Sequence, residues 1–281
     1  MVDLAFAPAQ ARAEVVAFMQ EAFPRAKWGT AGWQTLLAGR WAQPADPCAV
    51  VARDGDRIVG VLGLVFATRP TAHGPRRWVN LTSWYVLPDY RGEGLGQRMM
   101  EMAVALPGAT VTNFSSAVRA VPVVRRAGLQ VLDDTRCLWS ARISGAVRLA
   151  VKEDPQVDGH VGQVLRDHTG LPLRRIAVQT DEGPLIMVLM EARKHDAYVT
   201  HEVLFLSDPD RFAGHTRAVA DAVLPTDRAM LSVDSRFVRD LSVAEVVEPI
   251  PVPRFYSSPD MTPTGIDPMY TEIVLLGMKM H

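Results

Sequence analysis

The chain has 281 residues, of which 48% are hydrophobic and 22% charged, and its formal net charge is −1. This length suits one large domain or two of ordinary size, and the composition is that of a folded globular protein. The near-zero net charge predicts no nucleic-acid partner, and no apolar run approaches the roughly 20 residues that a membrane helix needs.

The first residues, MVDLAFAP, lack the basic start of a signal peptide. Cys48 and Cys137 lie far apart and form no disulfide or metal pattern. His195 and His201 have no carboxylate at a matching spacing, so we expect no metal site. Together these features predict a cytoplasmic protein without metal and without membrane contact.

The first half of the chain shows the order β-α-α-β-β-β-α-β-α-β. Apolar residues recur at helical spacing in some segments, whereas others are short apolar runs typical of strands. The expected strands are 2–8, 48–53, 57–68, 78–87, 109–115 and one or two within 129–143, and the expected helices are 9–23, 30–41, 95–106 and 121–129. This order predicts a mixed α/β domain over residues 1–143.

The second half repeats the pattern more weakly. Its expected helices are 159–170 and 211–225, and its expected strands are 174–180, 184–193, 197–206 and 228–233. Leu206 and Pro225 bracket a segment as Leu87 and Pro107 do in the first half, which indicates a diverged internal duplication. We therefore expect a second domain over 144–281, whose apolar C-terminal end fits either a helix or a strand.

The segment WVNLTSWYVLPDYRGEGLGQRMMEMAVAL, residues 78–106, places Gly92, Gly94 and Gly96 between a strand and a helix. Glycines let a ligand approach the backbone closely. The free amides at a helix start favour anions, so this turn is a candidate phosphate site. Arg91 adds a permanent cation with a planar fork that suits phosphate oxygens.

Two other phosphate motifs do not fit this segment. The dinucleotide fingerprint would need a third glycine where Gln97 stands, and no P-loop GKS or GKT run occurs. What does fit is Arg-x-x-Gly-x-Gly after a strand that ends in an apolar-x-Pro sequence. With Val86, Pro88, Arg91 and the glycines, the segment resembles the pyrophosphate loop of the GNAT superfamily of acyl-CoA-dependent N-acyltransferases.

The resemblance covers most of residues 3–143 and implies a GNAT fold with acetyl-CoA as co-substrate and no metal. The strand before the loop would hold the pantetheine arm through Trp84, Tyr85 and Val86. Asn113 ends the next strand, where a polar side chain often meets the cofactor. The loop would hold the pyrophosphate through Arg91, Gly92, Glu93, Gly94, Leu95, Gly96 and Gln97.

The resemblance also implies a catalytic glutamate and a catalytic tyrosine, and neither is present. The glutamate position corresponds to Asn80, which cannot accept a proton, and the tyrosine position corresponds to Val124. Asn80, Ser83 and Ser116 are the weak catalytic candidates that remain, with Ser115 a further nearby hydroxyl.

The second half lacks the loop, because an offset of 119 places Asp210 at the arginine position. Arg211, Ala213 and His215 replace the glycines, so we expect no second cofactor site. The resemblance implies a small-molecule amine acceptor, and Trp28, Trp33 and Trp41 are either core residues or one wall of its site. We expect an N-acetyltransferase, with a second copy of the chain as a homodimer partner; the alternative is a non-catalytic acyl-CoA-binding sensor or scaffold.

Overall fold

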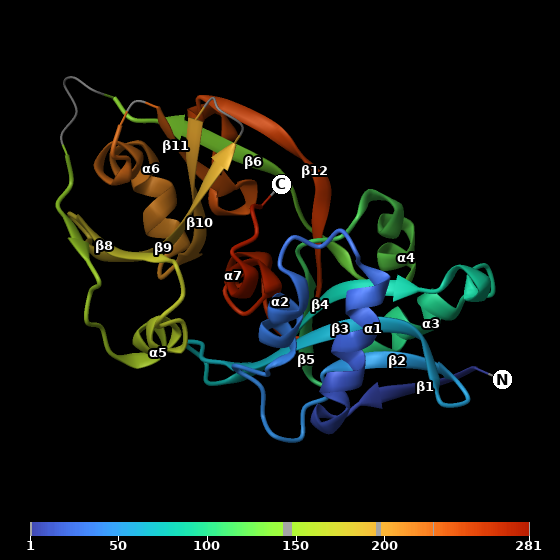
Figure 1. Cartoon of the computed structure of the whole chain (residues 1–281). Coiled ribbons are helices and arrows are strands. Elements are labelled where there is room, and N and C mark those ends of the chain that lie inside the picture. Colours follow the sequence, from blue (N-terminus) through green and yellow to red (C-terminus); the bar gives the residue numbers. More distant parts are fainter. Residues whose placement is uncertain (1, 143–147, 195–197, 227, 281) are drawn as a thin grey trace.

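A computed structural model describes residues 2–142, 148–194, 198–226 and 228–280. Two lobes share one mixed sheet, with helices on its faces (Figure 1). The strands are β1 (Val2–Ala7), β2 (Ala49–Asp54), β3 (Arg57–Arg69), β4 (Arg76–Val86), β5 (Ala109–Asn113), β6 (Gln130–Ser140), β7 (Val151–Glu153), β8 (Arg174–Thr180), β9 (Gly183–Lys194), β10 (Tyr198–Leu206), β11 (Ala229–Asp234) and β12 (Val246–Ser257). The α-helices are α1 (Arg12–Ala22), α2 (Gly29–Leu37), α3 (Leu95–Val104), α4 (Val121–Arg126), α5 (Gly159–Asp167), α6 (Pro209–Val223) and α7 (Glu272–Leu276).

The predicted mixed α/β class is confirmed, and the first half has the predicted order of elements. Strands β7 and β12 were not predicted from the sequence. Prolines disfavour a strand inside a sheet because they cannot donate to the ladder, and β12 contains Pro249, Pro251 and Pro253. The structure accommodates them where the pairing of β12 with β6 shifts register, between Pro249 and Arg254.

The two halves exchange their last strands. The sheet order is β1-β2-β3-β4-β5-β12-β6-β11-β10-β9-β8-β7. Counted from either edge of the sheet, five strands of one half are followed by the final strand of the other half. These final strands are β12, which lies next to β5, and β6, which lies next to β11. Both β4–β5 and β10–β11 are parallel, whereas the other pairs are antiparallel. This pseudosymmetry supports the predicted duplication; the proposed boundary at 143 and 144 lies outside the described residues.

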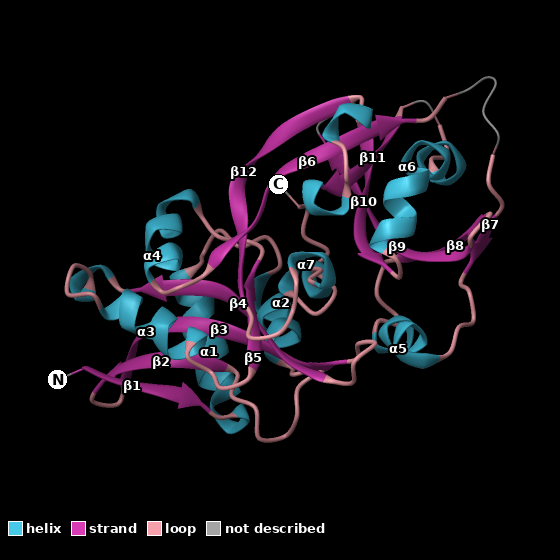
Figure 2. Ribbon diagram, turned by 180° about the vertical axis from the view of Figure 1, so that it is seen from behind, coloured by secondary structure: helices cyan, strands magenta, loops and turns pink. Residues whose placement is uncertain are grey.

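Helices cover both faces of the first-half sheet. On one face, α1 and α2 bury Val16, Met19 and Trp33 against β2 and β3. On the other face, α3 and α4 bury Met99 and Val124. The view from behind shows α3 and α4 in front of these strands (Figure 2). Successive side chains of a strand point to opposite faces, and β3 is buried at nearly every position because helices cover both faces.

The C-terminal segment lies between the two lobes, and α7 sits beside α2 (Figure 1). Three contacts hold the segment before α7. Arg69 at the end of β3 forms a buried ion pair with Asp267, and the Tyr270 hydroxyl donates to Asp167 at 2.7 Å. Trp41 packs edge-on to Tyr270 at 5.1 Å between ring centroids. Arg69 and Trp41 connect this segment to the first half, and Asp167 of α5 connects it to the second.

Among the described residues, no helix has the length and apolar character needed to cross a membrane. The cytoplasmic location stays a prediction.

The strand exchange predicts that neither half folds alone. Residues 1–142 without the rest of the chain leave β5 and β6 lacking the strand between them, so we expect this fragment to show no cooperative unfolding. Co-expression with residues 148–281 should give a 1:1 complex with a cooperative transition. Size-exclusion chromatography and circular dichroism measure both, and a cooperative transition in either lone fragment would contradict the interdependence.

Candidate functional site

A gap opens between β4 and β5. Their described pairing runs from Arg77 with Ala109 to Asn80 with Thr112 and ends there. Beyond Asn80, β4 continues to Val86 and pairs with β3 but no longer with β5. A parting of parallel strands leaves backbone amides and carbonyls without a neighbouring strand, and an extended ligand can pair with them.

A bulge in β4 shapes this gap. Register shifts between Val61 and Gly63 of β3, so that Ser83 and Trp84 lie opposite a single residue. Ser83 has a φ of 49°, which is unusual for a residue other than glycine. Bulges bend a strand and redirect its side chains, often beside functional sites. Here the bulge turns the end of β4 away from β5.

The glycine loop connects β4 with α3. Gly92 has a φ of 96° and Gly94 a φ of 72°, and an added Cβ on either would meet no atom within 4 Å. These two glycines are therefore required by backbone conformation. Gly94 is the N-cap of α3 and no side chain caps the helix there. The first amides of α3 are thus left for an anion.

Gly96 has a different role from the one the motif implied. It has ordinary helical backbone, and a Cβ there would lie 2.3 Å from Cζ2 of Trp84. The glycine therefore makes room for the indole ring against the first turn of α3. The indole Nε1 of Trp84 is buried without a hydrogen-bond partner, so the site contains an unused donor between the gap and the loop.

The side chains of the other loop residues differ in their contacts and in their exposure. The Nε of Arg91 donates to the carbonyl of Val86 at 2.8 Å, and its guanidinium lies 5.1 Å from the Tyr85 ring centroid. Leu95 is buried in the core, which leaves only its backbone for a ligand. Glu93 is exposed, and the Gln97 side chain donates to Glu101 at 2.9 Å.

Two cavities meet at the gap. One, of about 180 Å³, lies between β4 and β5 and is lined in part by Trp84, Asn113 and Ser116. The second, of about 410 Å³, has largely aromatic and apolar walls, including Trp28 and Trp33. The residues that line both cavities are Phe23, Thr82, Ser83, Ser115 and Arg119. The two spaces are therefore adjacent, with two serine hydroxyls at their junction.

The three tryptophans of the early helical region divide between two places. Trp28 and Trp33 pack edge-on at 5.3 Å and form a wall of the larger cavity. Trp41 instead contacts the second half, where its Nε1 donates to the carbonyl of Asp167 at 3.0 Å. The wall interpretation is therefore compatible with two of the three residues.

The polar candidates at the strand ends occupy different environments. Asn113 lines the smaller cavity and its Oδ1 accepts a hydrogen bond from the Ser116 hydroxyl at 2.8 Å. Ser83 lies at the junction, 3.1 Å from the hydroxyl of Thr82. Asn80 is fully buried, where its Oδ1 accepts from Thr112 at 3.0 Å.

Sequence analysis missed Glu272, the first residue of α7. Its carboxylate accepts hydrogen bonds from the Asn80 amide and from the Ser115 hydroxyl. Only 1% of Glu272 is exposed. Burial raises its pKa to about 7, while the donors Ser115 and Asn80 act in the opposite direction. A carboxylate from the C-terminal helix thus contacts Asn80, the residue at the β4 position where the resemblance implies a glutamate.

The corresponding place in the second half is already occupied. The Asp208 side chain caps α6 by accepting from the Arg211 amide at 2.9 Å. The Arg211 guanidinium donates to the carbonyl of Pro184 at 2.9 Å. The absence of a second cofactor site stays a prediction, which this self-capped helix start supports because its first amides are partly used.

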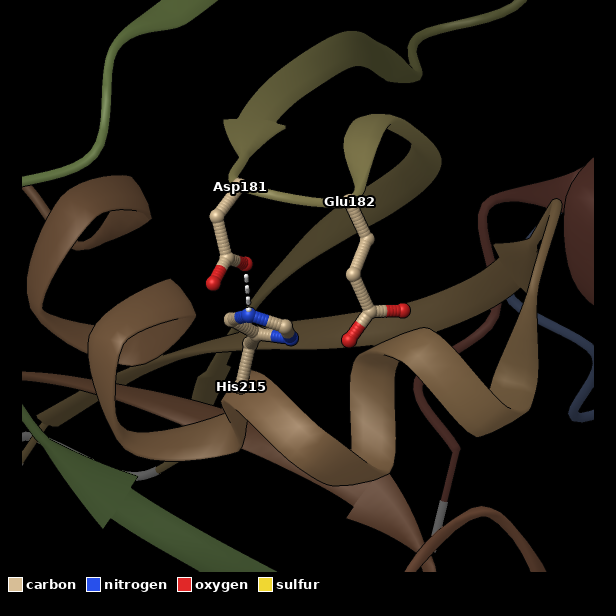
Figure 3. A group of neighbouring side chains, drawn as sticks. All are labelled: Asp181, Glu182 and His215. Carbon is tan, nitrogen blue, oxygen red and sulfur yellow. Dashed lines mark hydrogen bonds and ion pairs between the residues drawn. The ribbon is translucent and has the colours of Figure 1, made fainter.

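One described group of three side chains has spacing suited to a cation: Asp181, Glu182 and His215 (Figure 3). The His215 ring is bonded at both nitrogens, to the Arg211 carbonyl at 3.0 Å and to Asp181 at 2.7 Å. The Arg211 carbonyl, together with Asp181, raises the pKa of His215. These contacts favour the imidazolium, which cannot ligate a metal, so we interpret the group as an ion pair.

The expected absence of a metal elsewhere also stays a prediction. His201 is buried, and desolvation lowers its pKa. His195 lies outside the described residues.

Comparison with known proteins relates this geometry to a family. Residues 13–109 match the model of the acetyltransferase (GNAT) family. This segment of the chain is therefore similar to that family. The matched segment contains β4, the glycine loop and α3. No curated protein matches the sequence.

Solved GNAT structures resemble the whole chain in fold. A GCN5-related N-acetyltransferase from Anabaena variabilis is 9% identical with a TM-score of 0.54, covering 91% of this chain and 72% of that one. A GCN5-related N-acetyltransferase from Kribbella flavida is 12% identical with a TM-score of 0.53, covering 91% and 70%. A probable N-acyltransferase from Enterococcus faecalis is 11% identical with a TM-score of 0.52, covering 91% and 72%. The GNAT-like fold therefore includes both halves.

We expect Gly94→Asp to weaken acetyl-CoA binding by about 100-fold, because a carboxylate near the loop amides repels a pyrophosphate by a few kcal/mol. Gly108→Asp is the matched control, since Gly108 also has a positive φ, of 65°, and an open Cβ direction. Isothermal titration calorimetry compares the two variants. Equal affinities would mean that the phosphates bind elsewhere.

The raised pKa of Glu272 predicts a pH-dependent stability. Between its ordinary value of 4.5 and about 7, the folded protein keeps a proton that the unfolded chain releases. The free energy of unfolding therefore decreases as pH rises through this range. Glu272→Gln removes this ionisation. The free energy of unfolding of the variant, relative to that of the unaltered protein, should therefore increase by on the order of 3 kcal/mol between pH 4 and 8.

Urea unfolding at a series of pH values measures this difference. The control is Glu153→Gln, which changes a largely exposed carboxylate on β7 and should not reproduce the trend. A constant difference between Glu272→Gln and the unaltered protein from pH 4 to 8 would contradict the buried ionisation.

Proposed function

We propose that the protein is an N-acetyltransferase that transfers the acetyl group of acetyl-CoA to an amine. The observation that carries this proposal is the parting of β4 from β5 directly before an uncapped, glycine-initiated helix. An acyl-pantetheine arm can pair with the free edge of β4 while its pyrophosphate meets the amides of α3. The match of residues 13–109 to the GNAT family model supports this arrangement.

In this proposal the thioester lies in the smaller cavity and the amine enters from the larger one. The serines and Thr82 at the junction mark where the reacting atoms meet. Trp28, Trp33 and Tyr85 in the larger cavity favour an acceptor with an apolar or aromatic body. Holding both reactants in adjacent cavities lowers the entropic cost of their encounter.

A second candidate function is an acyl-CoA sensor without turnover. It is favoured by Val124, which occupies the position of the family's tyrosine and is completely buried in the core of the first half. A valine side chain at that position cannot donate a proton to the departing thiolate. The two functions share the cofactor loop and differ only in acetyl transfer.

We expect acetyl-CoA at 100 times its dissociation constant to stabilise the protein by about 2.7 kcal/mol. Release of free thiol from acetyl-CoA should then depend on an added amine, with aromatic and aliphatic amines preferred over polycationic amino sugars. Thermal shift and thiol titration measure the two steps. Binding without amine-dependent thiol release indicates the sensor, and the absence of both contradicts both functions.

A further inference from the structure

The C-terminal helix delivers a carboxylate to the back of the site. Glu272 lies behind Ser115, whose hydroxyl donates to Glu272 Oε1. Ser115 is exposed and lines both cavities, whereas Glu272 is buried. A continuous hydrogen-bonded path therefore runs from the junction of the cavities into the protein interior.

We propose that Ser115 and Glu272 form a proton relay that deprotonates the amine acceptor. Ser115 contacts the amine, and Glu272 is the terminal proton acceptor, acting through that hydroxyl. This inference rests on the proposed acetyl transfer and adds a base from a part of the chain outside the segment that matches the family model.

Asn80 fixes the orientation of the carboxylate. Its Oδ1 accepts from Thr112 at 3.0 Å, so its amide nitrogen is left to donate to Glu272 Oε2. The other carboxylate oxygen then faces Ser115. Asn80 is therefore a positioning residue, although it occupies the place where the family resemblance implied a base.

The charged groups around α7 are largely engaged with one another. Asp267 pairs with Arg69, and Asp167 accepts from Tyr270. His168 is bonded at both ring nitrogens to backbone carbonyls. The neighbouring helix α2, with the sequence GTAGWQTLL, carries no titratable side chain, and Arg119 lines both cavities.

Burial is thus the main cause of the raised pKa of Glu272, which lies near 7. A base with such a pKa is half ionised at neutral pH and accepts protons efficiently there. The proton and electron balance is complete. The neutral amine attacks the thioester carbonyl to form the C–N bond, and its proton passes to Ser115 Oγ while the Ser115 proton moves to Glu272. The C–S bond breaks with its electron pair on sulfur, and water protonates the thiolate.

The test is Glu272→Gln, whose side chain has the same shape and can accept from Asn80 while donating to Ser115. We expect acetyl-CoA affinity within twofold of the unaltered enzyme and kcat/KM at pH 8 lower by about 100-fold or more. The rising limb of the pH profile, with an apparent pKa near 7, should vanish. Ser115→Ala leaves the carboxylate in place and should lower kcat/KM by at least tenfold, with unchanged cofactor affinity.

The matched control is Glu202→Gln, a fully buried glutamate on β10 of the second half, which should keep the rising limb. A Glu272→Gln enzyme with the limb intact overturns the relay, as does a fully active Ser115→Ala enzyme if Glu272→Gln fails to fold. These failures differ from failure of the proposed function, in which the unaltered protein itself transfers no acetyl group from acetyl-CoA.

Discussion

The parting of β4 from β5 after Asn80 is the constraint on which the site depends. Had the two strands continued side by side, their backbone groups would have satisfied one another and no edge would face a ligand. The bulge at Ser83 and Trp84 makes the parting possible by adding a residue to β4 opposite β3. The loop and α3 then continue from the displaced strand, so that the helix start and the open edge face the same space.

The exchange of final strands explains how the C-terminal segment reaches this space. Because β12 pairs with both β5 and β6, the chain leaves the sheet beside the first half, at Ser257 opposite Val111 of β5. From there it passes between the lobes, where the Arg69–Asp267 pair fixes it before α7. The second half thus contributes to the site even though its own helix start is capped by Asp208.

Features that depend on neighbouring residues in the chain could be predicted from the sequence. The loop residues from Arg91 to Gln97 are contiguous, and the conformations of Gly92 and Gly94 follow from their chemistry. The reason why a glycine stands at position 96 could not be predicted from the motif. It is the Trp84 ring, which packs where a Cβ would lie. Likewise, prolines made β12 look unlike a strand, and only its register shift shows how the sheet accepts them.

Long-range contacts could not be predicted in the same way. Glu272 lies 192 positions from Asn80, and a single sequence carries no signal that joins them. The absence of a glutamate at position 80 was visible in the sequence, whereas the contact of Asn80 with Glu272 was not.

The position of α7 in chain order has a consequence for biosynthesis. The glycine loop at residues 91–97 emerges from the ribosome well before α7 at Glu272–Leu276. A partly synthesised chain therefore lacks the carboxylate behind Ser115, whatever the state of its glycine turn. In the proposed relay, a chain that ends before α7 has no terminal proton acceptor for Ser115.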